Sequence, residues 1–258
     1  MIRGLYAAAS GMIMGVLRQG LIAQDVANAN TPGYKQVSLP PTRATQLNLH
    51  RLSTAQTTAS TPAVGPAGTG VYPAPMETDF GQGVLQSTGR SLDVALEGEG
   101  FFQVQTPEGV RFTRDGRFHR DAAGNLVTTQ GYLVLSANSQ SVQLPQAGEV
   151  VIARDGTVSV DEQAAGRLGI FQVPVVSLQR AGENLFVSTP VPGQAPAATP
   201  QPATDVRVRQ GFLEGSNVDI AGTLVEMMSV ARTYEASQRL VQVQDEVLAR
   251  TMDVGRLG

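Results

Sequence analysis

Apolar residues near the start of the chain recur at alternating steps of three and four residues. The series runs Ile2, Leu5, Ala9, Met12, Val16, Gln19, Ala23 and Val26, in which only the glutamine is polar. This spacing is the a/d pattern of a helix that packs against a second helix. The segment 28–33 then supplies cap and turn residues followed by Pro-Gly, which ends a helix. The pattern predicts a helix from about Ile2 to about Ala27.

A second seven-residue repeat occupies the end of the chain, where Asp219 or Asn217 can cap a helix. Its apolar positions are Ile220, Met227, Tyr234, Val241 and Leu248. The companion positions are Leu224, Ala231, Gln238 and Asp245. These companions begin apolar and become polar, so the predicted seam weakens towards the C-terminus.

The two predicted helices are placed to pack on each other as an intrachain coiled coil, since the sequence between them has no helical period. Taken singly, each is equally well an ordinary core-facing stripe of a globular domain. The first helix is crowded with small residues that permit close approach but bury little area, and its glycines lower helix propensity; they are Ala7, Ala8, Ala9, Gly11, Gly15 and Gly20. We therefore expect ends that are weakly ordered in a monomer and become fixed when neighbouring copies cover their remaining faces.

Short apolar runs separated by glycine-containing turns follow from Leu92 onward and predict an all-β module. The predicted strands are Leu92–Leu96, Phe101–Gln105, Val110–Thr113, Leu126–Thr129, Tyr132–Leu135, Val150–Ala153, Val158–Val160 and Leu168–Val173. The tripeptides 114–116 and 154–156, both Arg-Asp-Gly, and 123–125, Ala-Gly-Asn, suit hairpin turns with positive φ at glycine.

Two segments lack this texture. Residues 36–89 are poor in charge and rich in Pro, Thr, Ala and Gly, which predicts an extended arm or, alternatively, a flexible linker, with a strand or two near Val71 and Val84. The predicted fold class is α+β, with N- and C-terminal helices paired as a coiled coil and an inserted all-β module. The predicted segments are a helix and turn over 1–35, an arm over 36–89, a β-module over 90–188, a connector over 189–210 and a helix over 211–258.

Composition argues against most enzyme classes and against bulk nucleic-acid binding. The formal net charge is -3 and the pI is near 5.4, which gives no field to attract phosphate backbones. The chain has no cysteine, and its two histidines, His50 and His119, have no metal-ligand spacing. Neither a G-x-S-x-G elbow nor a Walker A loop occurs. We predict no enzyme activity, no cofactor, no metal and no nucleic-acid partner.

The N-terminal residues also argue against a cleaved leader. Arg3, Arg18 and Gln19 interrupt the region that would have to be apolar, so the segment is interpreted as an amphipathic helix. We find no stretch that approaches the roughly 18 apolar residues of a membrane span. The chain is therefore predicted not to span a membrane, and any export would need a route without a cleaved signal peptide.

Clustered charges in the β-module raise one functional alternative. Four arginines recur every third residue at Arg111, Arg114, Arg117 and Arg120, and they are interpreted as solvated hairpin edges because steps of three alternate faces of a strand. His119 is likewise interpreted as a polar strand residue. Together with the acidic trio Asp93, Glu97 and Glu99, the arginines motivate the alternative of a secreted β-domain that binds or cleaves peptidoglycan.

Three motifs together resemble a known family. The segment 27–35, Ala-Asn-Ala-Asn-Thr-Pro-Gly-Tyr-Lys, is similar to the N-terminal signature of bacterial flagellar rod, hook and hook-associated proteins. Residues 92–102 and 112–116 resemble the family's β-module, and residues 211–219 with the helix segment 231–235 resemble its C-terminal signature. The length is similar to that of flagellar basal-body rod proteins of the FlgF or FlgG type. The stretch 113–116 favours FlgG, whereas the opening residues 1–6 and the modest length favour FlgF.

This resemblance implies a structural subunit of the rod. It implies helical polymerisation into an axial tube that transmits torque from motor to hook and lines the export channel, with partners that are copies of the chain and other rod or hook axial proteins. It also implies location in the flagellar basal body and passage through the flagellar export apparatus. The residues that we predict at the assembly interface are Leu5, Met12, Val16, Val26, Asn28, Asn30, Thr31, Gly33, Tyr34, Asn217, Ile220, Leu224, Met227, Tyr234, Val241 and Leu248.

Overall fold

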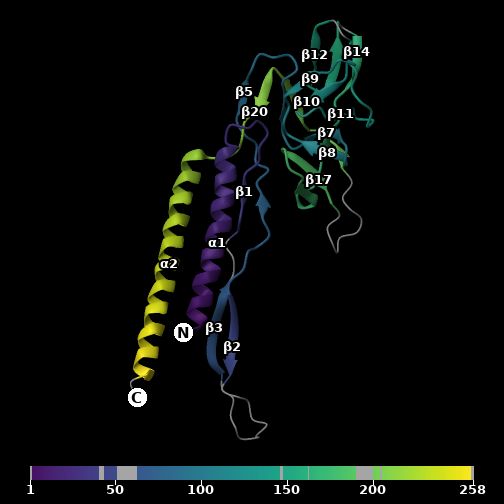
Figure 1. The fold of residues 1–258 in the computed structure, drawn as a ribbon. Helices are drawn as coiled ribbons and strands as arrows, with labels where there is room; N and C mark the ends of the chain where they lie inside the picture. Colours follow the sequence, from purple (N-terminus) through teal and green to yellow (C-terminus); the bar gives the residue numbers. More distant parts are fainter. Residues whose placement is uncertain are drawn as a thin grey trace, which may run out of the picture. The chain divides into compact units, whose positions relative to one another are not determined.

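A helix at each end of the chain and a β-rich region between them make up the fold (Figure 1), which confirms the α+β class. The computed structural model describes residues 2–40, 44–50, 63–145, 148–161, 163–189, 200–203 and 205–256. Packing divides the chain into a helical unit and a β-rich unit. The helical unit comprises Met1–Ala27, Val37–Thr78 and Asp219–Gly258, and the β-rich unit comprises Asn28–Gln36 and Asp79–Val218. The five predicted segment boundaries stay predictions, and half of the predicted connector lies outside the described residues.

The N-terminal helix, α1, covers Ile2–Ala27, as the sequence pattern predicts. A turn follows it, because the Thr31 amide donates to the Asn28 carbonyl at 3.0 Å and the Thr31 hydroxyl donates to Asn28 Oδ1 at 3.2 Å. Gly33 then adopts a φ of 70°, a backbone conformation that favours glycine. The predicted stop signals therefore act locally, within a few residues of the helix end.

The C-terminal helix, α2, covers Ile220–Arg256. Asp219 is its N-cap, since Asp219 Oδ1 accepts a hydrogen bond from the Ala221 amide at 3.2 Å. Asn217, the other predicted cap residue, instead accepts a hydrogen bond from the Gln36 amide in the β-rich unit. The choice between two cap residues that are two positions apart thus follows from what else each side chain binds.

The two helices lie side by side and run antiparallel within the helical unit (Figure 1). Arg18 of α1 and Glu226 of α2 form an ion pair at 2.6 Å. A Cβ placed on Gly11 would lie 3.6 Å from Ser237 Oγ, and one placed on Gly15 would lie 3.5 Å from Tyr234 Cδ2. The close approach of α2 to α1 therefore takes place over small residues of α1.

The face that α1 turns to α2 differs by about one residue from the predicted seam. Ala9, Val16 and Ala23 of that seam are exposed, whereas Gly4, Ala8, Gly11 and Gly15 form a stripe of low exposure. The physical reason is that larger side chains of α2 fit over glycine and alanine, where the backbones can come closer. In α2 the least exposed stripe is Thr223, Met227, Val230, Tyr234, Ser237, Val241, Gln244 and Leu248. This stripe contains four of the predicted apolar positions, Met227, Tyr234, Val241 and Leu248. Its other four residues each lie one position before a predicted companion residue.

One sequence-based expectation needs correction. The segment Gly4–Ala27 of α1 is long and apolar enough, by length and composition, to cross a membrane, although it was expected that no such stretch exists. The reason is that Leu, Ile and Val, together with Ala and Met, are spread through a segment that carries only two charges, Arg18 and Asp25.

Short strands complete the helical unit. β1 (Val37–Ser38) pairs antiparallel with β4 (Glu77–Thr78), and β2 (Ala44–His50) pairs antiparallel with β3 (Ala63–Val71). The Val71 amide donates to Ser10 Oγ of α1 at 3.1 Å. Part of the predicted arm is therefore a hairpin that contacts α1, and the strand expected near Val71 is confirmed.

The β-rich unit contains one large sheet and three small ones. The large sheet has the order β16-β17-β8-β7-β11-β10-β9, with β15 beside β7 and β18 beside β15. Its strands are β7 (Phe101–Thr106), β8 (Gly109–Thr113), β9 (Phe118–Arg120), β10 (Leu126–Thr128), β11 (Leu133–Val134), β15 (Ile170–Gln172), β16 (Leu178–Arg180), β17 (Leu185–Ser188) and β18 (Gln201–Pro202). The small sheets are formed by β12 (Val150–Ile152), β13 (Thr157–Val160) and β14 (Gln163–Arg167), by β6 (Val94–Glu97) with β19 (Arg207–Gln210), and by β5 (Leu85–Ser87) with β20 (Phe212–Glu214). A 3-10 helix, η1, covers Val175–Ser177.

Strand β7 separates two apolar clusters. Phe102 belongs to the larger cluster and packs edge-to-face on Phe118, with ring centroids 5.0 Å apart. Its neighbour Phe101 points to the other face, where Phe112, Phe171, Val173 and Phe186 form a second cluster. Adjacent residues of a strand face opposite sides, so two consecutive phenylalanines serve two cores. The β-rich unit therefore has a complete apolar interior of its own.

Two of the three predicted turns are confirmed and one is wrong. Gly156, between the paired strands β12 and β13, has a φ of 83°, and Gly124, between the paired strands β9 and β10, has a φ of 88°. The segment 114–116 is not a hairpin turn, because β8 pairs with β7 and β17 while β9 pairs with β10. Gly116 is required there for space, since a Cβ on it would lie 1.6 Å from the Val94 carbonyl oxygen.

This contact predicts that Gly116→Ala lowers the free energy of unfolding of the β-rich unit by about 3 kcal/mol or more, because the backbone of β6 would have to shift. Gly182→Ala is the matched control, since Gly182 has a φ of 86° but open space around it. The control should cost about 1 to 2 kcal/mol of backbone strain. Urea denaturation followed by circular dichroism measures both, and equal losses would contradict the role of close packing at Gly116.

Candidate functional site

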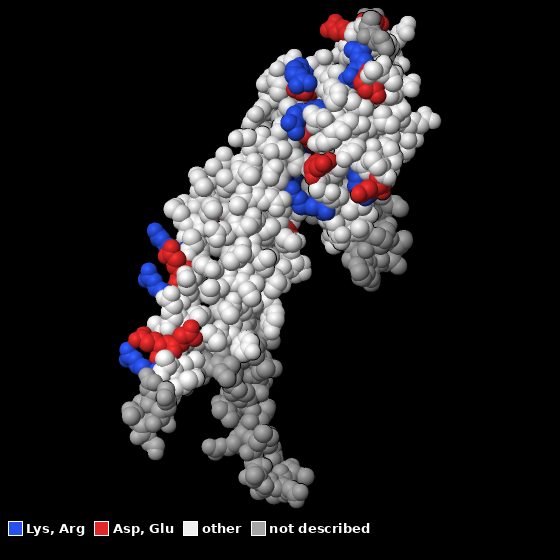
Figure 2. Space-filling model, viewed as in Figure 1, with Lys and Arg blue, Asp and Glu red and all other residues white. Residues whose placement is uncertain are grey.

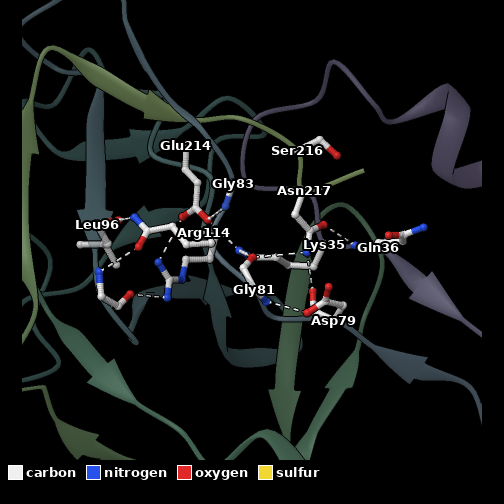
Figure 3. A network of polar contacts seen from close by, with 12 residues as sticks. Lys35, Gln36, Asp79, Gly81, Gly83, Leu96, Arg114, Glu214, Ser216 and Asn217 are labelled. Carbon is white, nitrogen blue, oxygen red and sulfur yellow. Dashed lines mark hydrogen bonds and ion pairs between the residues drawn. The ribbon is translucent and has the colours of Figure 1, made fainter. Parts of the chain in front are cut away.

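A buried cluster of three charged side chains lies in the β-rich unit (Figure 3). Lys35 Nζ lies 2.6 Å from Glu214 Oε1, and Arg114 Nη1 lies 3.1 Å from Glu214 Oε2. The exposed fractions of the Lys35, Glu214 and Arg114 side chains are 0%, 0% and 4%. Lys35 is the only lysine of the chain. We call these three residues the ion triad.

The ion triad joins three segments that are far apart in the sequence. Lys35 follows the turn after α1, Arg114 comes directly after β8, and Glu214 is the last residue of β20. Because β20 pairs with β5, the Glu214 backbone is fixed by strand hydrogen bonds. The fold therefore brings the N-terminal signature, the β-module and the C-terminal signature together at the Glu214 carboxylate.

Backbone groups satisfy much of the remaining hydrogen-bonding capacity of the triad. The Gly83 amide donates to Glu214 Oε1 at 2.9 Å, and Lys35 Nζ donates to the Gly81 carbonyl at 2.7 Å. Arg114 Nη2 donates to the Gly98 carbonyl at 2.7 Å. Arg114 Nε is buried and has no hydrogen-bond partner in the part of the chain that the structure describes. The triad is thus a nearly satisfied buried network, which requires accurate geometry.

The electrostatics of the triad are unequal, because one carboxylate faces two cations. Burial lowers the pKa of the Lys35 ammonium, and the Glu214 carboxylate opposes that effect by attraction and hydrogen bonding. Burial also lowers the pKa of the Arg114 guanidinium, again opposed by Glu214. Losing Lys35 leaves a balanced pair, whereas losing Glu214 leaves two buried positive charges. Glu214 is therefore the residue on which the cluster depends most.

We call the segment Asn28–Gln36 the strap. It is hydrogen-bonded to the segment that contains Glu214 and Asn217. The Gly33 amide donates to the Glu214 carbonyl at 2.8 Å, and the Gln36 amide donates to Asn217 Oδ1 at 2.7 Å. Asn217 Nδ2 also donates to the Asp79 carbonyl at 2.9 Å. A Cβ on Gly33 would lie 2.5 Å from the Arg114 carbonyl carbon. Glycine is thus needed at this position both for its φ and for space.

Tyr34 anchors the strap on its other side. Its side chain is buried, and the Arg180 guanidinium carbon lies 4.6 Å from the centre of its ring. Arg180 Nη1 also donates to the Lys35 carbonyl at 2.9 Å. Asn184 Nδ2 donates to the Pro32 carbonyl at 3.3 Å. The strap is therefore bound by β16, by the turn after it and by β20.

The predicted assembly residues divide by exposure. Of the helix residues, Val16, Ile220 and Leu224 are exposed, and the half-buried ones are Leu5, Met12, Val26, Met227, Tyr234, Val241 and Leu248. In the two signature segments Asn30 is exposed, Gly33 and Tyr34 are buried, and Asn28, Thr31 and Asn217 are half-buried. Sequence reasoning did not place Lys35, Arg114 and Glu214 together, because nothing in their spacing indicates a contact across 179 positions.

The interpretation of the arginine series as solvated edges is wrong for Arg114, and the Arg111 and Arg117 side chains are also only 16% and 32% exposed. Arg114 is a buried member of the ion triad and not a solvated edge, because Glu214 and the Gly98 carbonyl compensate its burial. Arg117 is half-buried and pairs with Asp115 at 2.7 Å, and Arg111 pairs with Glu108 at 3.2 Å. His119 lies exposed on β9, as predicted.

The three acidic residues Asp93, Glu97 and Glu99 contact other side chains of the β-rich unit. Glu97 pairs with Arg209 at 3.2 Å, Glu99 accepts a hydrogen bond from Gln172 at 3.3 Å, and Asp93 is buried with Arg90 3.6 Å away. Over the described ranges no group of three or more His, Asp or Glu side chains could hold a metal ion.

The helical unit presents a different kind of surface, with large apolar side chains exposed on both helices. They are Tyr6, Ile13, Val16, Leu17, Ile220, Leu224, Val225, Met228, Leu240, Val243, Val247 and Met252. Figure 2 shows that the charged side chains on the visible face of this unit gather along α2. These residues, named here the exposed helix faces, are the second candidate site.

The ion triad predicts unequal effects of removing its members. Glu214→Gln should lower the free energy of unfolding of the β-rich unit by about 3 to 5 kcal/mol, because Lys35 and Arg114 would remain buried without a counter-charge. Lys35→Met should cost clearly less, since Arg114 and Glu214 stay paired. Glu97→Gln, which breaks an exposed pair, should cost about 1 kcal/mol or less. Urea denaturation gives all three values, and a Lys35→Met loss as large as that of Glu214→Gln would contradict this charge balance.

Comparisons with known proteins agree on one family. Residues 95–160 match the family described as flagellar hook protein FlgE/F/G D1 domain, and residues 209–254 match the flagellar basal body rod FlgEFG protein C-terminal family. The chain is 31% identical to the flagellar basal-body rod protein FlgG of Bacillus subtilis (strain 168) over 269 residues, covering 99% of this chain and 100% of the relative.

Two further relatives carry the two names of this protein type. FlgG of Borreliella burgdorferi is 34% identical, with 96% of this chain and 97% of the relative covered. FlgF of Caulobacter vibrioides is 34% identical, with 92% of this chain and 91% of the relative covered. The chain belongs to the FlgF/FlgG family of flagellar basal-body rod proteins.

Proposed function

We propose that this chain is a structural subunit of the flagellar basal-body rod that polymerises through the exposed helix faces into an axial helical tube. Family membership supports the rod and its basal-body location. The observation that carries the mode of assembly is the exposure of large apolar side chains on both terminal helices. Many exposed large apolar side chains on two long helices are typical of an interface that is covered in the assembled state.

The described side chains of the helical unit form little apolar interior. Among them the buried apolar ones are Ala8, Ile22, Val37 and Val230, whereas exposed ones such as Ile13 at 62% are numerous. Ordering two long helices costs conformational entropy that so few buried side chains do not offset. Neighbouring subunits would supply the missing apolar contacts and order the helices.

We further propose that α1 and α2 pair as a coiled coil in the assembled rod. The low-exposure stripe of α2 follows steps of four and three residues, which is the heptad spacing. The predicted interface residues Met227, Tyr234, Val241 and Leu248 lie on that stripe and would hold the pair together. Val16, Ile220 and Leu224 would then contact neighbouring subunits. Gly33, Tyr34 and Asn217 would act on assembly indirectly, by holding the strap.

In this proposal the function is mechanical. The tube would transmit torque from motor to hook and would line the export channel, with copies of the chain and other rod or hook axial proteins as its neighbours. The subunit would pass through the flagellar export apparatus without a cleaved signal peptide. Both FlgG and FlgF are among its relatives, so the choice between these two rod positions stays open.

The peptidoglycan alternative has no comparable support. Arg114, which that alternative needs at the surface, is buried in the ion triad, and Asp93 is buried as well. The curated relatives are named as rod proteins. We therefore propose no turnover of a substrate.

The proposal predicts that Leu224→Asp abolishes assembly and leaves the subunit folded. The side chain is 44% exposed, so the free energy of unfolding should change by no more than about 0.5 kcal/mol. An unpaired carboxylate buried between subunits should cost about 3 kcal/mol or more at each interface, which lowers an association constant at least a hundredfold. Motility of cells that carry the variant and electron microscopy of their basal bodies measure assembly, and urea denaturation measures folding.

Gln238→Asp is the matched control, because it places the same charge at an exposed polar position of α2. It should leave rods and motility normal. Intact rods built from Leu224→Asp subunits would refute assembly through this face, whereas loss of rods with both variants would show only that α2 tolerates no added charge.

A further inference from the structure

We propose that the strap is a separately opening element, which detaches from the β-rich unit while the rest of that unit stays folded. The strap is the chain segment that directly follows α1. This inference concerns the isolated subunit and goes beyond assembly of the rod.

The first argument is that the apolar interior does not need the strap. Among the described residues, neither apolar cluster of the β-rich unit contains a strap residue. The clusters are built from residues of the region 80–208. Opening the strap would therefore expose Tyr34 and its seat but would leave both cores packed. Local opening of this kind requires less free energy than global unfolding.

The second argument is that the charges of the unit stay balanced when the strap leaves. Glu214 keeps Arg114 Nη1 at 3.1 Å and the Gly83 amide at 2.9 Å, both from outside the strap. Lys35 would regain water around its ammonium group, which offsets the loss of the ion pair. The unit thus loses one of two cations on the carboxylate, and no buried charge is left unpaired.

The third argument is that the strap is held by a few polar contacts and by one buried aromatic side chain. Hydrogen bonds at Gly33 and Gln36, the Lys35 contacts and the stacking of Arg180 on Tyr34 fasten it. Tyr34 is the one aromatic side chain of the strap, and it is fully buried. The side chain of Tyr34 should therefore set most of the opening equilibrium.

The sequence supplies a probe for this opening. Lys35 is the only lysine, and its ammonium group is inaccessible while the strap is docked. Modification of Lys35 by an excess of an amine-reactive ester should therefore proceed through the open strap, at a rate proportional to its population. Peptide mass spectrometry separates the modified Lys35 from the modified α-amino group.

Two variants loosen the strap and one does not. Tyr34→Ala should raise the modification rate of Lys35 in the full-length protein at least about tenfold, because a large buried side chain is lost. Arg180→Gln, which removes the stacking and the hydrogen bond to the Lys35 carbonyl, should raise it about threefold or more. Phe118→Leu weakens the larger apolar cluster, which among the described residues contains no strap residue, and should leave the rate unchanged, although it raises the global unfolding constant.

The comparison is decisive because local and global opening respond differently to the core variant. A Lys35 modification rate that rises in Phe118→Leu by the same factor as the unfolding constant would overturn the proposal, since Lys35 would then be reached only by global unfolding. An unchanged rate in Phe118→Leu with faster modification in Arg180→Gln would support it, even where Tyr34→Ala fails to fold. Because no polymer is involved, this result is independent of whether the subunit assembles as proposed.

Discussion

The arrangement of the segments around the ion triad depends on the contacts of the Glu214 carboxylate. It receives Lys35, Arg114 and the Gly83 amide, so a single acidic group fixes three segments that the chain order keeps far apart. Burying three charges is costly, and the gain is geometric: only one arrangement of the segments satisfies them. Gly33 and Gly116 serve the same end, because the backbones around the triad approach more closely than a side chain would allow.

Periodic patterns in the sequence predicted the helices and most strands. They did not predict contacts between residues that are far apart in the sequence. The bounds of α1 and most strands of the β-module follow from apolar spacing and glycine turns, because these signals act over a few residues. The seam of α1 was placed about one residue off, since the contact follows Gly11 and Gly15 and not the larger side chains. Arg114 was interpreted as a solvated edge residue because its partner lies 100 positions away and no local pattern indicates Glu214.

The two units have opposite designs. The β-rich unit buries phenylalanines on both faces of β7 and needs no neighbour to complete its interior. Among its described side chains the helical unit buries few apolar ones, chiefly Ala8, Ile22, Val37 and Val230, and it leaves large apolar side chains in water. A subunit that must remain separate before assembly and become rigid afterwards benefits from this contrast, because only the incomplete part responds to neighbours.

The ion triad also explains why polar contacts hold the strap, although apolar contacts would cost less free energy to bury. An apolar seat for the strap would tolerate sliding, because apolar contacts have no preferred direction. A lysine that must reach both Glu214 Oε1 and the Gly81 carbonyl has one register only. The same directionality allows clean release, since Arg114 keeps Glu214 neutralised when Lys35 departs. Precise docking and reversible docking therefore follow from one property of the cluster, its two cations on one carboxylate.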